Sequence, residues 1–305
     1  MRCTHPLYAL DFGIDKNTGK RMISLKGTHN PDLSSLRALE GRYGHGSIIP
    51  LPCGKCLACK VNYSRDWSIR CLLEASLHKN NYFVTFTYDD EHLPVDRRLN
   101  PDDMTNFIKR LRNNLEGVRY FYCGEYGSTT FRPHYHAILF NCDIPDLKFI
   151  GNRDGNPFYE SKFLRDLWQL GNIQVGEVTL ATCEYVARYV IKKFNTKFGD
   201  EFLRMSLKPG LGAEYFYKHF ETIYDTDGVY VAGQKHGIPR YFDKLLERLD
   251  TDKFRSIKYE RIKDLSATRI SALVDHAMEF DEQVLKYEND INVNSMKNKF
   301  KRGRV

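Results

Sequence analysis

Two histidines separated by a single residue form the sharpest chemical feature of this 305-residue sequence. His134 and His136 lie in a segment typical of a β-strand, so both imidazoles point to the same side. Glu125 precedes them, and a hairpin between the two segments would place its carboxylate beside the imidazoles. Two neutral imidazoles and one carboxylate predict a site for Mg²⁺ or Mn²⁺ with open positions for a phosphate. The alternative is a pair of strand histidines on a solvated face.

A second chemical feature is a pair of tyrosines in a segment with helical periodicity. Tyr185 and Tyr189 are four residues apart and share one helical face, which Lys192 continues. A phenol with a pKa of about 10 is a poor nucleophile in water. A metal ion, together with a cation such as Lys192 or Lys193, would stabilise the phenolate and the phosphate that it attacks. The alternative is an amphipathic helix with two tyrosines at its surface.

A cluster of cysteines indicates a second metal site. Cys53, Cys56 and Cys59 have the spacing of thiolates that share one ion, and Cys3 is the expected fourth ligand, with His5 as a substitute. Four such ligands predict a closed, structural Zn²⁺ site, whereas a ferredoxin-type cluster requires another cysteine shortly after the third. Reduced thiols without a metal are the alternative. The other four cysteines fall on predicted core faces: Cys71, Cys123, Cys142 and Cys183.

The elements that must position these residues form an ordered series in the middle of the chain. Apolar periodicity predicts helices at residues 62–78, 100–115, 160–170 and 181–194, and strands at residues 82–88, 118–123, 135–140 and 172–178. Gly171 is the expected cap of the third helix. A short polar connection, residues 124–133, joins the second and third strands and favours antiparallel pairing. We therefore expect an α+β fold with an antiparallel central sheet flanked by helices.

Composition divides the chain into three expected domains. Residues 1–61 have few regular periods and hold the cysteine cluster, and residues 62–200 hold the helix and strand series. Residues 201–305 contain turn signals, a charged segment at 245–286 that we expect to be helical, and a basic tail at 296–305. The tail is suited to gripping phosphates, with a solvated chain end as the alternative.

Overall composition excludes several classes of protein. The net charge is +7, which favours a polyanionic partner only weakly. Mean hydropathy is −0.52, and no run approaches the roughly 20 apolar residues of a spanning helix, so no membrane partner is expected. The first residues lack the apolar core of a signal peptide, and the clustered cysteines indicate a reducing compartment. No phosphate-binding loop is present, which argues against a helicase motor in the chain.

Taken in order, these motifs resemble those of replication initiation proteins of the HUH endonuclease superfamily. They are most similar to the gokushovirus branch of the Microviridae, which are single-stranded DNA bacteriophages. The segment Val84–Tyr88 resembles the first strand motif, His134–His136 the histidine–hydrophobe–histidine element, and Tyr185–Lys193 the two-tyrosine motif. Glu125 stands where related proteins carry an acidic third metal ligand. The superfamily likeness spans residues 82–195, and the likeness to gokushovirus proteins extends it to most of the chain.

The resemblance implies a ferredoxin-like or RRM-like HUH fold and a rolling-circle replication initiator. Such an enzyme nicks and rejoins one DNA strand at a specific site, using Mg²⁺ or Mn²⁺. One tyrosine forms a 5′-phosphotyrosine and frees a 3′-OH, and the second tyrosine cuts the regenerated origin after one round. The resemblance assigns four catalytic residues and three metal ligands: Tyr185, Tyr189, Lys192 and Lys193, and Glu125, His134 and His136.

The implied partners are single-stranded DNA, double-stranded replicative-form origin DNA, and a host helicase and polymerase, in the cytoplasm of an infected bacterium. A relaxase or transposase of the same chemistry is a close alternative and would differ in its DNA substrate. A sequence-specific DNA-binding protein with structural zinc and no chemistry is an alternative of another class. Metal-dependent nicking distinguishes the last reading from the other two.

Overall fold

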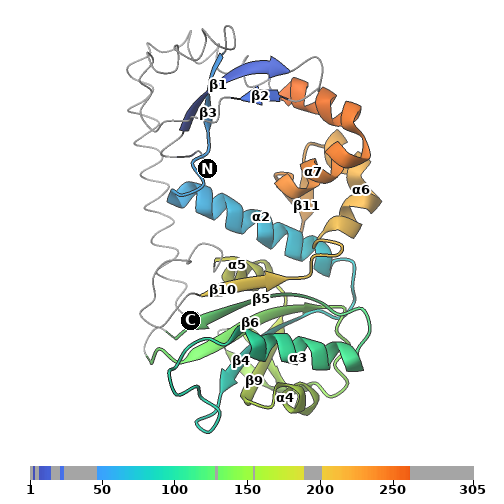
Figure 1. The fold of residues 1–305 in the computed structure, drawn as a ribbon. Helices are drawn as coiled ribbons and strands as arrows, with labels where there is room; N and C mark the ends of the chain where they lie inside the picture. The colour runs from blue at the N-terminus through green and yellow to red at the C-terminus, as the bar shows by residue number, and fades with distance from the viewer. Residues whose placement is uncertain are drawn as a thin grey trace. The chain divides into compact units, whose positions relative to one another are not determined.

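The structure is a computed structural model that describes residues 3, 7–14, 21–23, 47–127, 130–153, 155–188 and 201–261 (Figure 1). The chain forms two compact units. The first comprises Met1–Asn62 and Ser266–Val305, and the second comprises Tyr63–Leu265. Each is described by itself below. The division into three domains, at residues 61 and 200, stays a prediction.

The first unit contains a three-stranded antiparallel sheet in the order β2-β1-β3. Its strands are β1 (Leu7–Ile14), β2 (Arg21–Ile23) and β3 (Ser47–Leu51). They are not predicted from the sequence, because residues 1–61 show few regular periods. The helix α2 (Leu57–Ala75) begins six residues after β3, at the end of this unit.

The second unit is built on a seven-stranded sheet in the order β10-β5-β6-β4-β9-β8-β7, in which every neighbouring pair is antiparallel. The strands are β4 (Tyr82–Tyr88), β5 (Arg119–Tyr126), β6 (Pro133–Phe140), β7 (Lys148–Arg153), β8 (Asn156–Glu160), β9 (Gly171–Glu177) and β10 (Phe202–Met205). Helices flank the sheet, so the expected α+β fold is confirmed (Figure 1).

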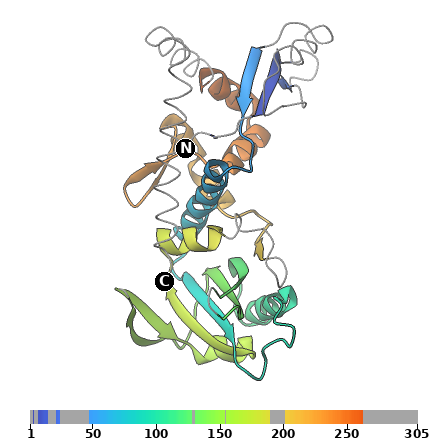
Figure 2. The ribbon, with the colours of Figure 1, turned by 90° about the vertical axis from the view of Figure 1, so that its left-hand side faces the viewer.

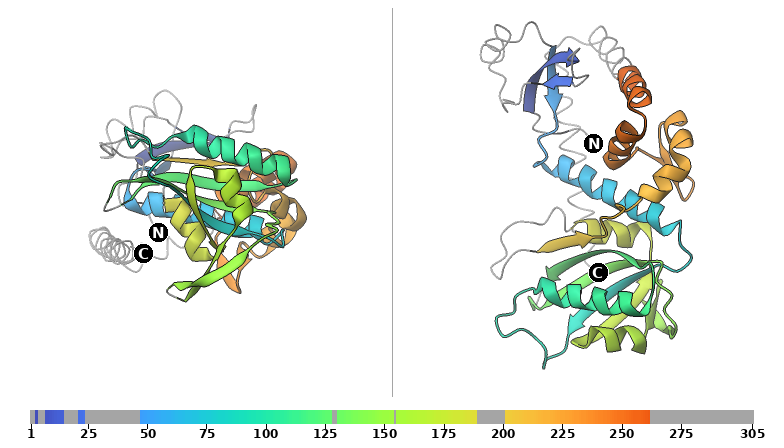
Figure 3. Two further views of the ribbon diagram at one scale, coloured as in Figure 1. Left: turned by 90° about the horizontal axis from the view of Figure 1, so that it is seen from below. Right: turned by 45° about the vertical axis from the view of Figure 1, so that its right-hand side comes forward.

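Helices cover both faces of this sheet (Figure 3). On one face lie α3 (Pro101–Asn114) and α4 (Lys162–Trp168), where the ring of Phe86 contacts those of Phe107 and Trp168 at centroid distances of 4.6 and 5.2 Å. On the other face lie α2 and α5 (Leu180–Arg188), where Trp67 stacks on Phe121. Each such buried ring contributes about 1.5–3 kcal/mol relative to an exposed one.

Two more helices pack against α2 (Figure 2). They are α6 (Ala213–Asp225) and α7 (Arg240–Leu249), and a small hairpin of β11 (Val229–Val231) and β12 (Gln234–His236) lies between them in the chain. Residues 251–261 form a further helix. None of the helices in the described ranges is both long and apolar enough to cross a bilayer.

Three expectations about elements need correction. The predicted helix at 160–170 ends at Trp168, and Gln169, with φ +66°, is its cap; Gly171 instead begins β9. The segment from residue 245 is not one helix, because α7 stops at Leu249 and Asp250 is extended. The strand predicted at 118–123 continues to Tyr126. The ends of the two predicted helices beyond residues 188 and 261, and the basic tail, lie outside the described residues.

Candidate active site

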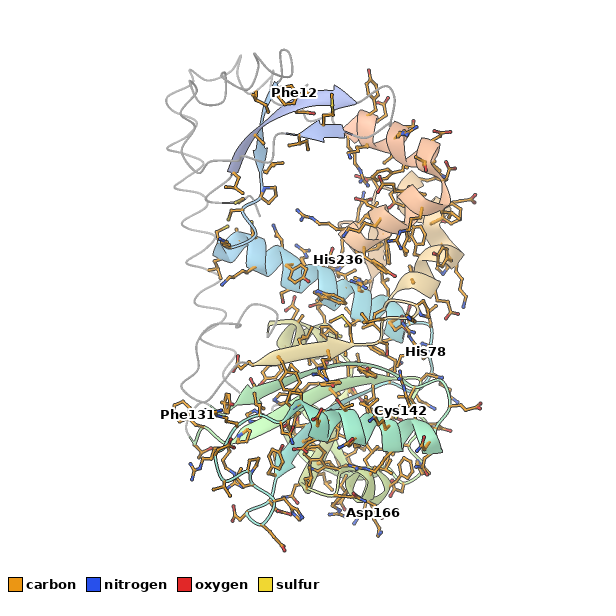
Figure 4. The ribbon with its side chains drawn as sticks, viewed as in Figure 1. Phe12, His78, Phe131, Cys142, Asp166 and His236 are labelled. Carbon is orange, nitrogen blue, oxygen red and sulfur yellow. The ribbon has the colours of Figure 1, made fainter. Side chains whose placement is uncertain are left out.

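A hairpin positions the three predicted metal ligands. In the antiparallel pairing of β5 and β6, Glu125 is directly opposite His134, and Cys123 is opposite His136. Alternation along each strand puts all four side chains on the sheet face that α2 and α5 cover. Phe131, labelled in Figure 4, lies in the turn that closes this hairpin. The predicted hairpin is therefore confirmed, with Glu125 inside the strand and not in the connection.

The three side chains meet at one carboxylate oxygen. Nε2 of His134 and Nε2 of His136 each lie 2.7 Å from Oε1 of Glu125. Neighbouring ligands of an octahedral ion with bonds of about 2.1 Å are about 3.0 Å apart, so the group would hold an ion after opening by a few tenths of an ångström. Two imidazole nitrogens and one carboxylate oxygen are donors suited to a divalent cation, and the residues therefore fit the metal site that the sequence predicts.

Burial and charge favour a cation at this position. Glu125 is 3% exposed and His136 6%. Burial would raise the pKa of Glu125, but hydrogen bonds and charges from His134 and His136 outweigh it and hold the pKa well below its usual range. A buried carboxylate that stays ionised attracts positive charge in a region of low dielectric constant. The site can therefore bind a metal ion without first losing a proton from Glu125.

Each imidazole is oriented from behind by another oxygen. Nδ1 of His134 lies 3.1 Å from the carbonyl oxygen of Arg132, which can only accept, so this nitrogen carries a proton and Nε2 faces Glu125. Nδ1 of His136 lies 3.0 Å from Oγ1 of Thr85, its partner on β4. Such outer contacts fix the ring orientation of metal-binding histidines.

Two of the supporting residues are not identified from the sequence. Thr85 and Phe83 come from the central strand β4, and Phe83 stacks on His136 with the ring planes 7° apart. The alternation of β4, a segment singled out only as a motif, contained the signal, because residues 83 and 85 share the face of the histidines.

The helix α5 brings a tyrosine hydroxyl to the same carboxylate. Cys183, Val186 and Ala187 are buried against the sheet, which turns Tyr185 toward the ligands. Its Oη donates to Oε1 of Glu125 at 2.7 Å and lies 3.4 Å from Nε2 of His136. A nucleophile and three cation ligands thus share one position on the sheet.

The remaining predicted site residues fall into two groups. Tyr189, Lys192 and Lys193 lie outside the described residues. The cysteine set is brought together in the first unit, where the sulfur atoms of its four members lie within 4.8 Å of one another: Cys3, Cys53, Cys56 and Cys59. The prediction that the other four cysteines are core residues is confirmed, since each is fully buried: Cys71, Cys123, Cys142 and Cys183.

Comparisons with known proteins point to DNA replication. A family described as replication-associated protein ORF2 matches residues 81–194, which include β4 to β9 and α5. The chain is 38% identical to replication-associated protein ORF2 of Spiroplasma virus 4, covering 67% of this chain and 70% of that protein. It is 34% identical to replication-associated protein VP4 of Bdellovibrio phage phiMH2K (76% and 78%) and 30% identical to replication-associated protein ORF4 of Chlamydia phage 1 (68% and 58%). No solved structure matches the chain.

Proposed function

Because the chain belongs to the replication-associated proteins of the gokushovirus type, we propose that it initiates rolling-circle replication by nicking and rejoining one DNA strand at a specific site. The observation that carries this proposal is the contact between the Tyr185 hydroxyl and the Glu125 carboxylate inside the pair of histidines. A non-catalytic DNA-binding protein has no need for a nucleophile at a cation site.

In the proposed reaction the chain's own residues hold the ion and supply the nucleophile. Glu125, His134 and His136 would bind Mg²⁺ or Mn²⁺, and a divalent ion held there polarises a phosphate and stabilises the charge that develops on it. Oη of Tyr185 attacks the phosphorus, and the bond from phosphorus to the 3′ oxygen breaks. The phenol proton passes, through solvent, to the leaving 3′ oxygen. The products are a 5′-phosphotyrosine and a free 3′-OH.

The second tyrosine and the lysines complete the proposal. Tyr189 follows Tyr185 by four residues and would cut the regenerated origin after one round, so that the first 3′-OH can close the displaced circle. Lys192 or Lys193 would stabilise the phosphate or the leaving oxygen. These three assignments rest on the sequence and on its resemblance to HUH initiators.

The proposal includes partners and a place of action. The substrates would be single-stranded DNA and the origin in double-stranded replicative-form DNA. Since no phosphate-binding loop was found in the sequence, a host helicase would open the duplex and a host polymerase would extend the 3′-OH. The protein would act in the cytoplasm of the infected bacterium. A relaxase or transposase would use the same residues on another DNA.

A cleavage assay with matched variants tests the proposal. Single-stranded origin DNA is incubated with the full chain, with and without Mn²⁺, and nicked strands are separated on a denaturing gel. We expect metal-dependent nicking that the double substitution Tyr185→Phe plus Tyr189→Phe abolishes. Substituting Tyr217→Phe, an exposed tyrosine of α6, serves as the control and should leave nicking unchanged. Nicking that persists in the double variant would contradict the mechanism.

A further inference from the structure

Four cysteine sulfurs converge in the first unit, away from any role in the proposed DNA chemistry. They come from three places: Cys3 near the start of the chain, Cys53 and Cys56 in the loop after β3, and Cys59 in the first turn of α2. We propose that they bind one Zn²⁺ ion as a closed, structural tetrathiolate site.

The spacing of the sulfurs suits a single ion. Sγ of Cys3 and Sγ of Cys56 are 3.7 Å apart, and all four lie within 4.8 Å of one another. Four sulfurs at about 2.3 Å from a tetrahedral Zn²⁺ are about 3.8 Å apart. A disulfide requires about 2.05 Å, so these thiols are not oxidised pairs. An iron–sulfur cluster places a different iron under each thiolate and therefore needs sulfurs further apart.

The backbone around Cys53 is arranged to stabilise a thiolate. The amide groups of Lys55 and Cys56 both donate to Sγ of Cys53, at 3.4 and 3.3 Å, and the amide of Cys53 donates to Sγ of Cys3 at 3.3 Å. Gly54 makes this turn possible, because its φ of +71° is in the left-handed region. Three N–H donors aimed at two sulfurs favour charged sulfur, which is the form that binds a metal.

Strand pairing explains why Cys3 is the fourth member. In the antiparallel pairing of β1 and β3, Leu7 is opposite Leu51. Continuing that register beyond the ends of the strands brings residue 3 alongside the Cys53–Cys56 loop. A distant residue is therefore delivered to the cluster by the fold of this unit, and the spacing of the other three is local.

A structural ion has a clear physical use in this unit. Its described apolar core is small, with Ala9 and Leu10 the fully buried members of β1. A module with so little buried apolar surface gains much of its stability from a metal or a disulfide. Four protein ligands leave no open position for a substrate, so the ion would hold structure and take no part in catalysis.

Zinc content of the full chain tests the proposal. Because the histidine site can also hold Zn²⁺, the protein carries His134→Ala plus His136→Ala, and zinc is counted by mass spectrometry after treatment with a weak chelating resin. We expect one zinc per chain, bound to sulfur only at about 2.3 Å in X-ray absorption spectra. A chain without zinc, or a zinc ion bound mainly to nitrogen and oxygen, would overturn the proposal.

Single substitutions in the same background identify the ligands. Cys56→Ser should lose the zinc, whereas Cys142→Ala, which removes a buried thiol of the second unit (Figure 4), should keep it. If Cys56→Ser fails to fold, Cys3→His gives the answer, because it should retain zinc with one nitrogen among three sulfurs. Full zinc content in Cys56→Ser, or four sulfurs in Cys3→His, would overturn the assignment. No DNA is used, so the result is independent of the proposed nicking activity.

Discussion

The hydroxyl of Thr85 offers a sharp test of how the candidate metal site is built. It lies 3.0 Å from Nδ1 of His136, a ring that is 6% exposed and whose Nε2 faces Glu125. Thr85→Val keeps the shape of the side chain and removes the oxygen. The substitution leaves all three proposed ligands in place, so any change in metal binding reports on the orientation of His136.

The expected magnitude follows from the burial of that imidazole. Removing the hydrogen-bond partner of a buried polar group costs about 1–3 kcal/mol, which corresponds to about 5- to 150-fold in Kd. Outer contacts of metal-binding histidines change affinity over a similar range, about 10- to 100-fold. We therefore expect Mn²⁺ affinity to fall by at least about fivefold, with a normal nicking rate restored at saturating Mn²⁺.

A matched control is available on the same strand. Thr87 bonds through Oγ1 to the carbonyl oxygen of Asn172, and Thr87→Val removes a hydroxyl without touching His136. Free Mn²⁺ is measured by electron paramagnetic resonance during titration of each full-length protein. Thr87→Val should stay within about twofold of the parent, as for a surface change of about 0.5 kcal/mol. Equal Mn²⁺ affinity in Thr85→Val and the parent would refute the orienting role of Thr85.

Further predictions concern stability. Glu74→Ala leaves Arg119 without its buried carboxylate partner and should lower the free energy of unfolding by about 3–5 kcal/mol in urea titrations, whereas an effect under 1 kcal/mol would contradict the pairing. Gly171→Ala should cost about 3 kcal/mol or more in the same assay, because φ is +144° and the added Cβ would lie 2.3 Å from the backbone at the end of β4; a neutral result would contradict that geometry. Burial and then the charge of Arg65 lower the pKa of His236 (Figure 4), so its neutral form contributes stability above the ordinary pKa of about 6.5 that is lost as pH falls. His236→Asn should flatten stability measured from pH 7.5 to 5, and an unchanged slope would argue against this contribution.

The ligand set was predictable because it depends on local pattern. Histidines two apart on a strand must share a face, and a hairpin between neighbouring strands must bring Glu125 to them. The place of Tyr185 required one more step, since helix periodicity identifies the face it shares with Tyr189 but not the sheet on which that face lies. The buried positions Cys183 and Val186 decide this in the structure.

Other features depend on contacts between distant segments and were not predictable. Gly124 suggests the end of a strand, but β5 continues through it because Phe202 of β10 fills the space where a side chain would be; an added Cβ would lie 2.7 Å from that ring. Gly171 has the residue type of a helix cap, and its positive φ serves instead a close approach to β4. The β7–β8 hairpin is hidden because Phe149 and Ile150, adjacent in sequence, are both about half exposed, which breaks the expected alternation.

Identification of the covalently attached tyrosine tests the central claim most directly. The full chain is incubated with Mn²⁺ and single-stranded origin DNA, the DNA is trimmed by nuclease, and tryptic peptides are sequenced by mass spectrometry. Cleavage after Arg188 separates Tyr185 and Tyr189 into different peptides, so the two are distinguished without mutation. We predict a nucleotide 5′-phosphate on Tyr185, on Tyr189, or on both. Nicked DNA with no covalent adduct, or an adduct on any other residue, would contradict the mechanism.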